Sequence, residues 1–126
     1  MTARTILVAD DETHILNVVS MKLRNAGYRV VTARDGREAL DAALHEKPDL
    51  VITDYHMPEL SGLELCRRLK DDASTCHIPA IMLTARGYNL EAHDTEGSGV
   101  LFMISKPFSP RQLLEFVNDV LNKTAA

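Results

Sequence analysis

The sequence has 126 residues, the usual length of one domain that buries an apolar core without the help of disulfides or metals. Apolar residues make up 45% of it and charged residues 25%, which excludes disordered, collagen-like and coiled-coil chains. Its 14 basic and 18 acidic residues give a net charge of -4 at pH 7. This balance argues against direct binding to nucleic acid or to an anionic membrane surface.

The N-terminal segment lacks the features of a signal peptide, because the acidic run Asp10-Asp11-Glu12 directly follows its first short apolar segment. No stretch has the length of a transmembrane helix. The two cysteines, Cys66 and Cys76, form no CxxC motif, and the five histidines share no ligand-like spacing. We therefore expect reduced, inert thiols, a cytoplasmic location and no insertion into a membrane.

Five apolar segments of strand length are separated by segments with helical periodicity. Most of the five are continuous apolar runs, which are typical of strands buried on both faces of a parallel sheet. The exception is the second segment, which is more polar. In chain order, the predicted strands are residues 6–9, 28–32, 50–52, 80–83 and 100–104.

Helical spacing of apolar side chains predicts a helix after each of these strands. Gly27 and Pro48 mark the ends of the first two helices. Ser61-Gly-Leu-Glu64 is a capping box for the third, and Ser109-Pro110 begins the last with proline at its first position. The apolar positions are Ile15, Val18, Val19 and Leu23 in the first helix, Leu40, Ala43 and Leu44 in the second, Leu65, Cys66 and Leu69 in the third, and Leu113, Phe116, Val117, Val120 and Leu121 in the last.

The predicted fourth helix, within residues 87–99, is the weakest element. Three glycines and only two aliphatic anchors, Leu90 and Ala92, lie in this segment. We expect it to be short, mobile or irregular. Five strand-helix units with right-handed crossovers still predict an α/β fold, a doubly wound parallel sheet with helices on both faces.

Polar side chains gather at the predicted carboxyl ends of the strands, where ligands bind in such sheets. The first strand leads into Asp10 and Asp11, the third ends in Asp54, the fourth in Thr84, and the fifth leads into Lys106. Any one of these residues has an ordinary structural explanation, as a helix cap, a strand residue or a solvated lysine. All five at matching strand ends favour a functional site.

Three carboxylates at one edge need a cation or protons to offset their repulsion. Two carboxylates about 4 Å apart repel by roughly 4 kcal/mol at an effective dielectric constant of about 20. Magnesium takes oxygen ligands and is typically held by one or two carboxylates together with a phosphate. The sequence therefore predicts a Mg²⁺ site at this edge.

Four segments resemble the receiver domain of bacterial two-component response regulators. The separations between Asp11, Asp54, Thr84 and Lys106 are also close to the family pattern, and the similarity covers essentially the whole chain. The resemblance implies a flavodoxin-like fold with strand order 2-1-3-4-5, with residues 1–126 as one receiver domain and no output domain in the chain. The matching segments are Asp10-Asp11, Val51-Ile-Thr-Asp54-Tyr-His-Met57-Pro58, Leu83-Thr84-Ala85 and Ser105-Lys106-Pro107-Phe108.

The same resemblance implies the chemistry. Asp54 accepts a phosphoryl group from a histidine of a sensor kinase or histidine phosphotransfer protein. The metal ligands are Asp11 and Asp54 directly, Asp10 mostly through water, and the backbone carbonyl of His56. Lys106 and the Thr84 hydroxyl hold phosphoryl oxygens, and the Lys106-Pro107 bond is cis. By the same resemblance, the protein is a phosphoacceptor that assists its own phosphorylation and autodephosphorylation. It is then not an enzyme that turns over a separate substrate.

The resemblance also has departures. An aromatic residue is usual three positions before the lysine, and Met103 stands there, while Leu101-Phe102 replaces a polar pair. Because side chains alternate along a strand, we expect Leu101 and Met103 on one face of the fifth strand and Phe102 and Ile104 on the other. Because the predicted fourth helix offers little apolar cover, we expect the fifth strand to leave apolar area exposed. We therefore expect the fourth helix, fifth strand and fifth helix to contact a downstream protein. His56 and Arg86 occupy positions that tune phosphate lifetime in the family; for His56, a general base and a surface contact are both open.

Three other functions share parts of this pattern. A haloacid-dehalogenase-like phosphatase also uses an aspartyl phosphate with magnesium, but it needs an acid two residues after the nucleophile, where this chain has His56. A nucleotide- or flavin-binding module would need a glycine-rich phosphate loop, and no GxGxxG or P-loop motif is present. A degenerate receiver that only docks is disfavoured by the complete set of five site residues. We expect a single-domain regulator or phosphorelay intermediate.

Overall fold

The computed structural model describes residues 3–85 and 97–124. Most of the segment predicted to form the fourth helix lies outside these residues, as does Arg86; residues 97–99 form a turn. The elements in chain order are β1 (Thr5–Ala9), α1 (Thr13–Asn25), β2 (Arg29–Ala33), α2 (Gly36–Glu46), β3 (Leu50–Asp54), α3 (Gly62–Asp71), β4 (Ala80–Thr84), β5 (Val100–Ser105) and α5 (Pro110–Thr124).

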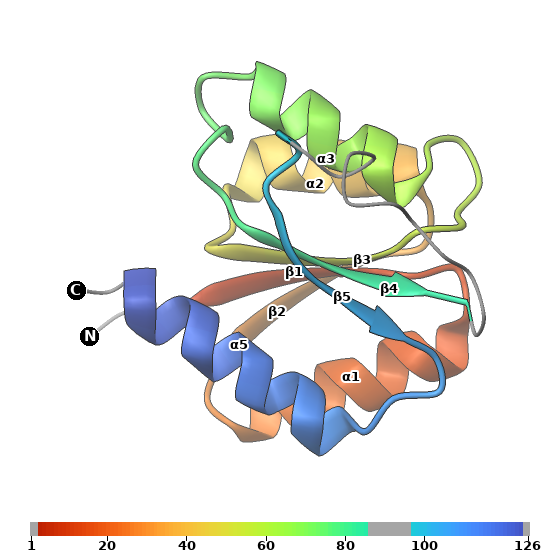
Figure 1. The fold of residues 1–126 in the computed structure, drawn as a ribbon, viewed down its shortest axis with the longest axis vertical. Coiled ribbons are helices and arrows are strands. Elements are labelled where there is room, and N and C mark those ends of the chain that lie inside the picture. The colour runs from red at the N-terminus through yellow and green to blue at the C-terminus, as the bar shows by residue number, and fades with distance from the viewer. Residues whose placement is uncertain (1–2, 86–96, 125–126) are drawn as a thin grey trace.

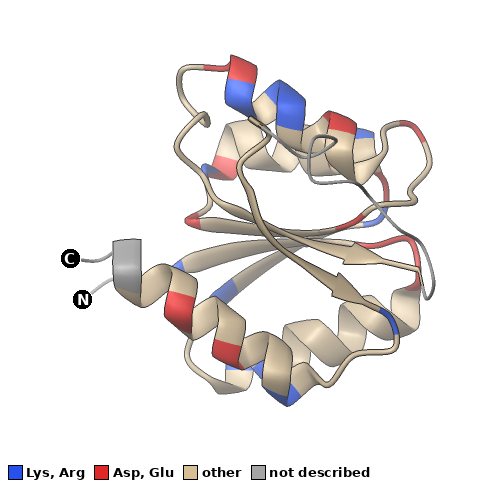
Figure 2. Ribbon diagram, in the orientation of Figure 1, with Lys and Arg blue, Asp and Glu red and all other residues tan. Residues whose placement is uncertain are grey.

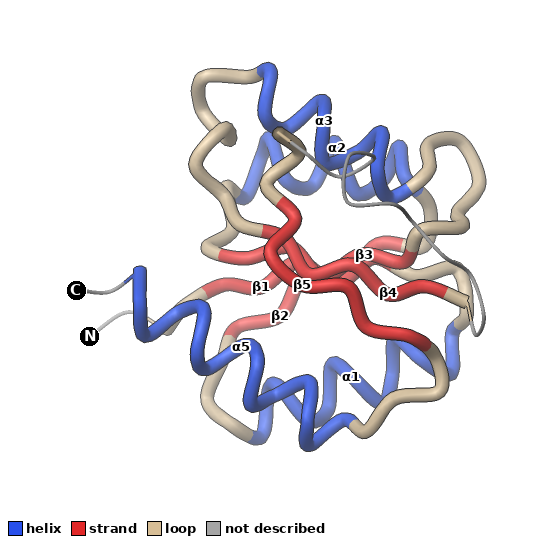
Figure 3. The backbone as a smooth tube through the Cα atoms, viewed as in Figure 1, coloured by secondary structure: helices blue, strands red, loops and turns tan. Residues whose placement is uncertain are grey.

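The five strands form one parallel sheet in the order β2-β1-β3-β4-β5, which confirms the predicted topology. Helices α1 and α5 cover one face, and α2 and α3 cover the other (Figure 1). The tube view shows the twisted strands between these two helical layers (Figure 3). Because the chain winds outward in both directions from β1 and β3, the sheet has its switch point at the carboxyl ends of these two strands.

The apolar side chains form two cores, one on each face of the sheet. Alternate residues of a strand point to opposite faces, so neighbours such as Leu7 and Val8 of β1 belong to different cores. Val8 packs with α1 and α5, including Leu23 and Val117, whereas Leu7 packs with α2 and α3, including Leu65. This double burial explains the continuous apolar runs of the central strands.

Strand β5 departs from the expectation that its apolar run is buried on both faces. All residues of β3 and β4 are buried, but along β5 partly buried and exposed residues alternate. Leu101 and Met103 are 56% and 42% exposed, whereas Phe102 and Ile104 pack against the core on the α1 and α5 side. The predicted alternation and the predicted exposure of apolar area on this strand are therefore confirmed; the general expectation that continuous apolar runs are buried on both faces fails for β5, which is an edge strand.

The predicted helix boundaries are also confirmed. The Ser61 hydroxyl accepts a hydrogen bond from the Glu64 backbone N–H at 3.2 Å, and Pro110 is the first residue of α5. Gly27 has φ 98°, a conformation that favours glycine, just after the end of α1. Helix α1 begins differently: its N-cap residue is Glu12, whose side chain makes no capping hydrogen bond.

Candidate functional site

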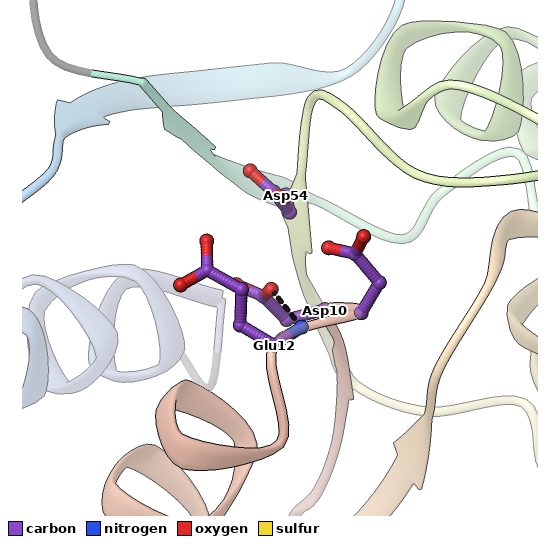
Figure 4. A group of neighbouring side chains, drawn as sticks. Asp10, Glu12 and Asp54 are labelled. Carbon is purple, nitrogen blue, oxygen red and sulfur yellow. Dashed lines mark hydrogen bonds between the residues drawn. The ribbon is translucent and has the colours of Figure 1, made fainter.

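The side chains predicted to form a site meet at the carboxyl edge of the sheet. Asp10 directly follows β1, Asp54 ends β3, Thr84 ends β4, and Lys106 follows β5. The carboxylates of Asp10, Glu12 and Asp54 converge between the first and third strands (Figure 4). The acidic segment after β1 and the basic position after β5 lie at the same edge of the molecule (Figure 2).

The backbone around Asp54 is fixed from two sides. The Tyr55 N–H donates to the Leu83 carbonyl of β4 at 2.8 Å, and the Gly62 N–H donates to the Tyr55 carbonyl at 2.8 Å. A Cβ atom on Gly62 would lie 2.2 Å from the carbonyl oxygen of Asp54, so only glycine lets α3 start this close to the strand. The position of Asp54 is therefore set by contacts with both β4 and α3.

The ammonium of Lys106 contacts three carboxylates. Its Nζ lies 2.9 Å from Asp10 Oδ2, 3.0 Å from Glu12 Oε1 and 3.5 Å from Asp54 Oδ1. The Lys106 backbone N–H donates to the Thr84 carbonyl at 2.8 Å, which ties the end of β5 to β4. The Lys106-Pro107 peptide bond is cis, as the family resemblance of the sequence implied. Lysine and carboxylates thus partly neutralise one another at this edge.

Burial dominates the electrostatics of the site. Burial, and after it the charge of Asp10, raise the pKa of Asp54, Lys106 opposes both effects, and the net pKa is about 6. The pKa of Asp10 is also raised by burial, although the Glu12 N–H and Lys106 stabilise its charged form. For Lys106, burial lowers the pKa, but the hydrogen bonds to Asp10 and Glu12 outweigh burial and raise it overall. Lys106 therefore carries its charge near neutral pH.

A small cavity of about 200 Å³ opens directly on Asp54. Asp10 and Thr84, both predicted site residues, are buried and do not belong to its wall, among the residues that the structure describes. Asp10 acts on the cavity through Lys106, and Thr84 is followed directly by the wall residue Ala85. The described residues that line the cavity are Asp11, Glu12, Asp54, His56, Ala85 and Lys106.

Four carboxylates in this region fit a hard divalent cation. One oxygen from each of Asp10, Asp11, Glu12 and Asp54 lies within 4.8 Å of the others. Oxygen donors of this charge are those that Mg²⁺ prefers. The His56 side chain is not a member of this group of carboxylates, although His56 is exposed and lines the same cavity. Its ring lies edge-on to the ring of Tyr55, with the ring centroids 4.7 Å apart. The acidic pocket is compatible with Mg²⁺.

Sequence reasoning did not assign a role to Glu12. The structure places its side chain in the wall of the cavity, next to Lys106, as a partner of the lysine. A signal was present in the sequence, since a glutamate stands where a helix normally begins with Ser, Thr, Asp or Asn. The two cysteines agree with the expectation of reduced thiols: both are free, and burial raises the pKa of Cys66 to about 12.

The model of the response regulator receiver domain family matches residues 6–118 of the chain. The chain belongs to this family. Phosphorylation on an aspartate is general in receiver domains, which work in two-component signal transduction. This membership decides against the phosphatase and nucleotide-binding alternatives.

Individual relatives agree with the family match. The receiver domain is 40% identical over 124 residues to the phosphate regulon transcriptional regulatory protein PhoB of Pseudomonas aeruginosa, covering 98% of the chain and 54% of that protein. It is 32% identical to the polar-differentiation response regulator DivK of Brucella anthropi, covering 94% of the chain and 96% of that protein. The chemotaxis response regulator CheY4 of Vibrio cholerae superposes with a TM-score of 0.86 at 34% identity, covering 94% of this chain and 99% of that one.

The chain spans about half the length of the first curated relatives that it matches. DivK, in contrast, is matched over nearly its full length. Within the described ranges, no helix of the receiver domain has both the length and the apolar character needed to cross a membrane.

Proposed function

We propose that Asp54 is the phosphoacceptor of this receiver domain and that the donor is a phosphohistidine of a sensor kinase or histidine phosphotransfer protein. The observation that carries this proposal is the position of Asp54 at the end of a buried central strand. There it lines the cavity and lies 3.5 Å from the Lys106 ammonium. A carboxylate in such surroundings is a competent nucleophile for phosphoryl transfer.

In the proposed transfer, an oxygen of ionised Asp54 forms a bond to phosphorus while the bond between phosphorus and the donor nitrogen breaks. The electron pair of the broken bond stays with the donor imidazole, which takes up a proton. Lys106 offsets the charge that spreads over the phosphoryl oxygens. The Thr84 hydroxyl is the second group assigned to these oxygens, and its backbone already contacts Lys106 at 2.8 Å.

The carboxylates of Asp10, Asp11 and Asp54, with the His56 carbonyl, are assigned to Mg²⁺. When bound, Mg²⁺ neutralises charge on the transferring group and on the acidic cluster. This chain's own residues supply the ligands and keep them in place. The Glu12 N–H donates to Asp10 Oδ1 at 2.9 Å, and Lys106 Nζ donates to Asp10 Oδ2. These two hydrogen bonds fix the carboxylate of the buried Asp10, which precedes the exposed Asp11 in the chain.

Residues 1–126 act together as one cytoplasmic receiver domain that passes the signal to a downstream protein. The domain has no separate substrate turnover. The proposed contact face comprises β5, α5 and the segment predicted to form the fourth helix, most of which lies outside the described residues. Leu101 and Met103, which expose apolar area on β5, support this face. Met103 replaces the aromatic residue of the family, and its flexible side chain repacks easily.

The test is phosphotransfer from purified histidine kinases and phosphotransfer proteins that carry radiolabelled phosphate. We expect at least one donor to label the wild-type domain in Mg²⁺. Asp54→Asn should remain unlabelled, and Asp119→Asn, which removes an exposed carboxylate of α5, should be labelled like wild type. Labelling of Asp54→Asn at the wild-type rate would overturn the assignment of the acceptor.

A further inference from the structure

Glu12 occupies a helix start without capping it. Its backbone is the N-cap of α1, but its side chain makes no capping hydrogen bond. The N-caps of α2 and α3 behave differently: Asp35 accepts from the Glu38 N–H at 2.8 Å, and Ser61 accepts from the Glu64 N–H at 3.2 Å. The carboxylate of Glu12 therefore serves another purpose than stabilising its own helix.

That purpose is visible in a closed ring of contacts among three residues. The Glu12 backbone N–H donates to Asp10 Oδ1 at 2.9 Å, and Lys106 Nζ donates to Asp10 Oδ2 at 2.9 Å. Lys106 Nζ also donates to Glu12 Oε1 at 3.0 Å, which completes the ring. Residue 12 thus fixes the buried aspartate with its backbone and the lysine with its side chain.

We propose that Glu12 is a positioning residue that holds the ammonium of Lys106 against the acceptor Asp54. An ammonium group has three N–H donors. Asp10 and Glu12 engage two of them at 2.9 and 3.0 Å, which leaves the third for Asp54 at 3.5 Å. This inference rests on the proposed function, in which that third donor serves the phosphoryl oxygens.

The need for a second anchor follows from the lysine side chain. Four flexible bonds connect its ammonium to the backbone, and a single hydrogen bond leaves the remaining donors free to rotate. The Asp10 carboxylate is also assigned to Mg²⁺, so Lys106 and the metal compete for its oxygens. Glu12, whose side chain is 56% exposed at the mouth of the site, supplies an anchor outside the buried pair.

The first experiment measures the rate of phosphorylation of the full chain by acetyl phosphate and Mg²⁺. We expect Glu12→Ala to lower the maximal rate about threefold to fivefold, the scale of a partly exposed ion pair, without changing the KM for acetyl phosphate. Glu12→Gln, which keeps a hydrogen-bond acceptor, should recover most of the rate. Asp41→Ala, which removes an exposed carboxylate from α2, outside the proposed contact face, should behave as wild type.

The same change in a Lys106→Ala background decides whether Glu12 acts through the lysine. We expect Glu12→Ala to have no further effect on the residual rate there. An undiminished effect in that background, or an unchanged rate of Glu12→Ala alone, would overturn the inference while the proposed function stands. Loss of Mg²⁺ affinity in Glu12→Gln as large as in Asp11→Asn would also overturn it, because Glu12 would then be a metal ligand.

A second experiment does not depend on phosphorylation. The metal-free proteins are treated with a limiting amount of acetic anhydride, and acetylation of each lysine is measured by mass spectrometry. Lys70, whose Nζ donates to the Cys76 carbonyl at 2.8 Å, is the internal reference. We expect Lys106 to react faster relative to Lys70 in Glu12→Ala than in wild type. Equal relative rates would contradict the inference, even if the wild-type protein accepted no phosphoryl group and the proposed function failed.

Discussion

The ammonium of Lys106 lies 3.5 Å from the carboxylate of Asp54, and both residues are tied to the same strand, β4. The Lys106 N–H donates to the Thr84 carbonyl, and the Tyr55 N–H donates to the Leu83 carbonyl, each at 2.8 Å. The relative position of Asp54 and Lys106 is therefore set by the end of β4. A shift of the backbone at Thr84 would move Lys106 with it.

Ionised Asp54 should destabilise the metal-free domain. Burial raises its folded-state pKa to about 6 from an ordinary value of 3.8, so between these values the folded state binds more protons than the unfolded state. Stability contributed by this group is therefore present at low pH and is lost as pH rises through this window. We expect Asp54→Asn to be more stable than wild type by about 1–3 kcal/mol at about pH 8, with the difference vanishing toward about pH 4.

Urea denaturation in EDTA across this pH range checks the expectation. Asp119→Asn is the control, because it removes an exposed carboxylate from α5. A stability difference between Asp54→Asn and wild type that does not change with pH would show that the Asp54 carboxylate does not titrate in the expected window.

Magnesium binding should depend on Asp11 and weaken in acid. Asp11 is exposed in the wall of the cavity, and its carboxylate belongs to the group of four. We expect Asp11→Asn to weaken Mg²⁺ binding at least about tenfold, because it removes a charged ligand. Wild-type affinity should fall as pH drops through about 6, since protons then compete for Asp54. Titration calorimetry measures the Mg²⁺ affinity of wild type, of Asp11→Asn and of the control variant Asp119→Asn. Equal affinities for Asp11→Asn and Asp119→Asn would contradict the assignment of Asp11 as a ligand.

Gly62 should tolerate no side chain. A Cβ atom there would lie 2.2 Å from the Asp54 carbonyl oxygen, so α3 or the end of β3 must move. We expect Gly62→Ala to lower the free energy of unfolding by about 2–4 kcal/mol. The matched control is Gly27→Asn, at a position with φ 98° and open space around it, where asparagine should cost less than about 1 kcal/mol. Similar urea midpoints for the two variants would show that the contact at Gly62 relaxes easily.

The two faces of β5 should respond differently to truncation. Phe102 packs against Phe116 with ring centroids 4.8 Å apart, whereas Met103 is 42% exposed. We expect Phe102→Ala to lower the free energy of unfolding by about 2–4 kcal/mol and Met103→Ala to change it by less than about 0.5 kcal/mol. Thermal or urea unfolding distinguishes them. A loss in Met103→Ala as large as in Phe102→Ala would mean that Met103 is part of the core.

The site could be predicted from the sequence because it depends on topology. Asp54 and Lys106 are far apart in the chain, but each lies at the carboxyl end of a strand, and parallel strands bring those ends to one edge. The apolar runs of β1, β3 and β4 reported burial on two faces and thus the position of these strands within the sheet.

Other features depend on the direction of single side chains or on which elements pack together, and the hydrophobic pattern of the sequence contains neither. The weak helical pattern before β5 predicts that this strand exposes apolar area, but which of its two faces is exposed follows only from its position in the sheet. The contact between Glu12 and Lys106 requires a particular direction of the glutamate side chain. The close approach of Gly62 to Asp54 needs the position of α3, which helical periodicity does not supply.

The most direct test of the central claim is the intact mass of the domain after incubation with acetyl phosphate and Mg²⁺, followed by peptide mapping. We expect wild type to gain the mass of one phosphoryl group, the group to map to Asp54, and EDTA to prevent its addition. Asp54→Asn should gain nothing, while Asp119→Asn should match wild type. Equal incorporation into Asp54→Asn, or a phosphoryl group mapped to another residue of the wild-type protein, would contradict the account.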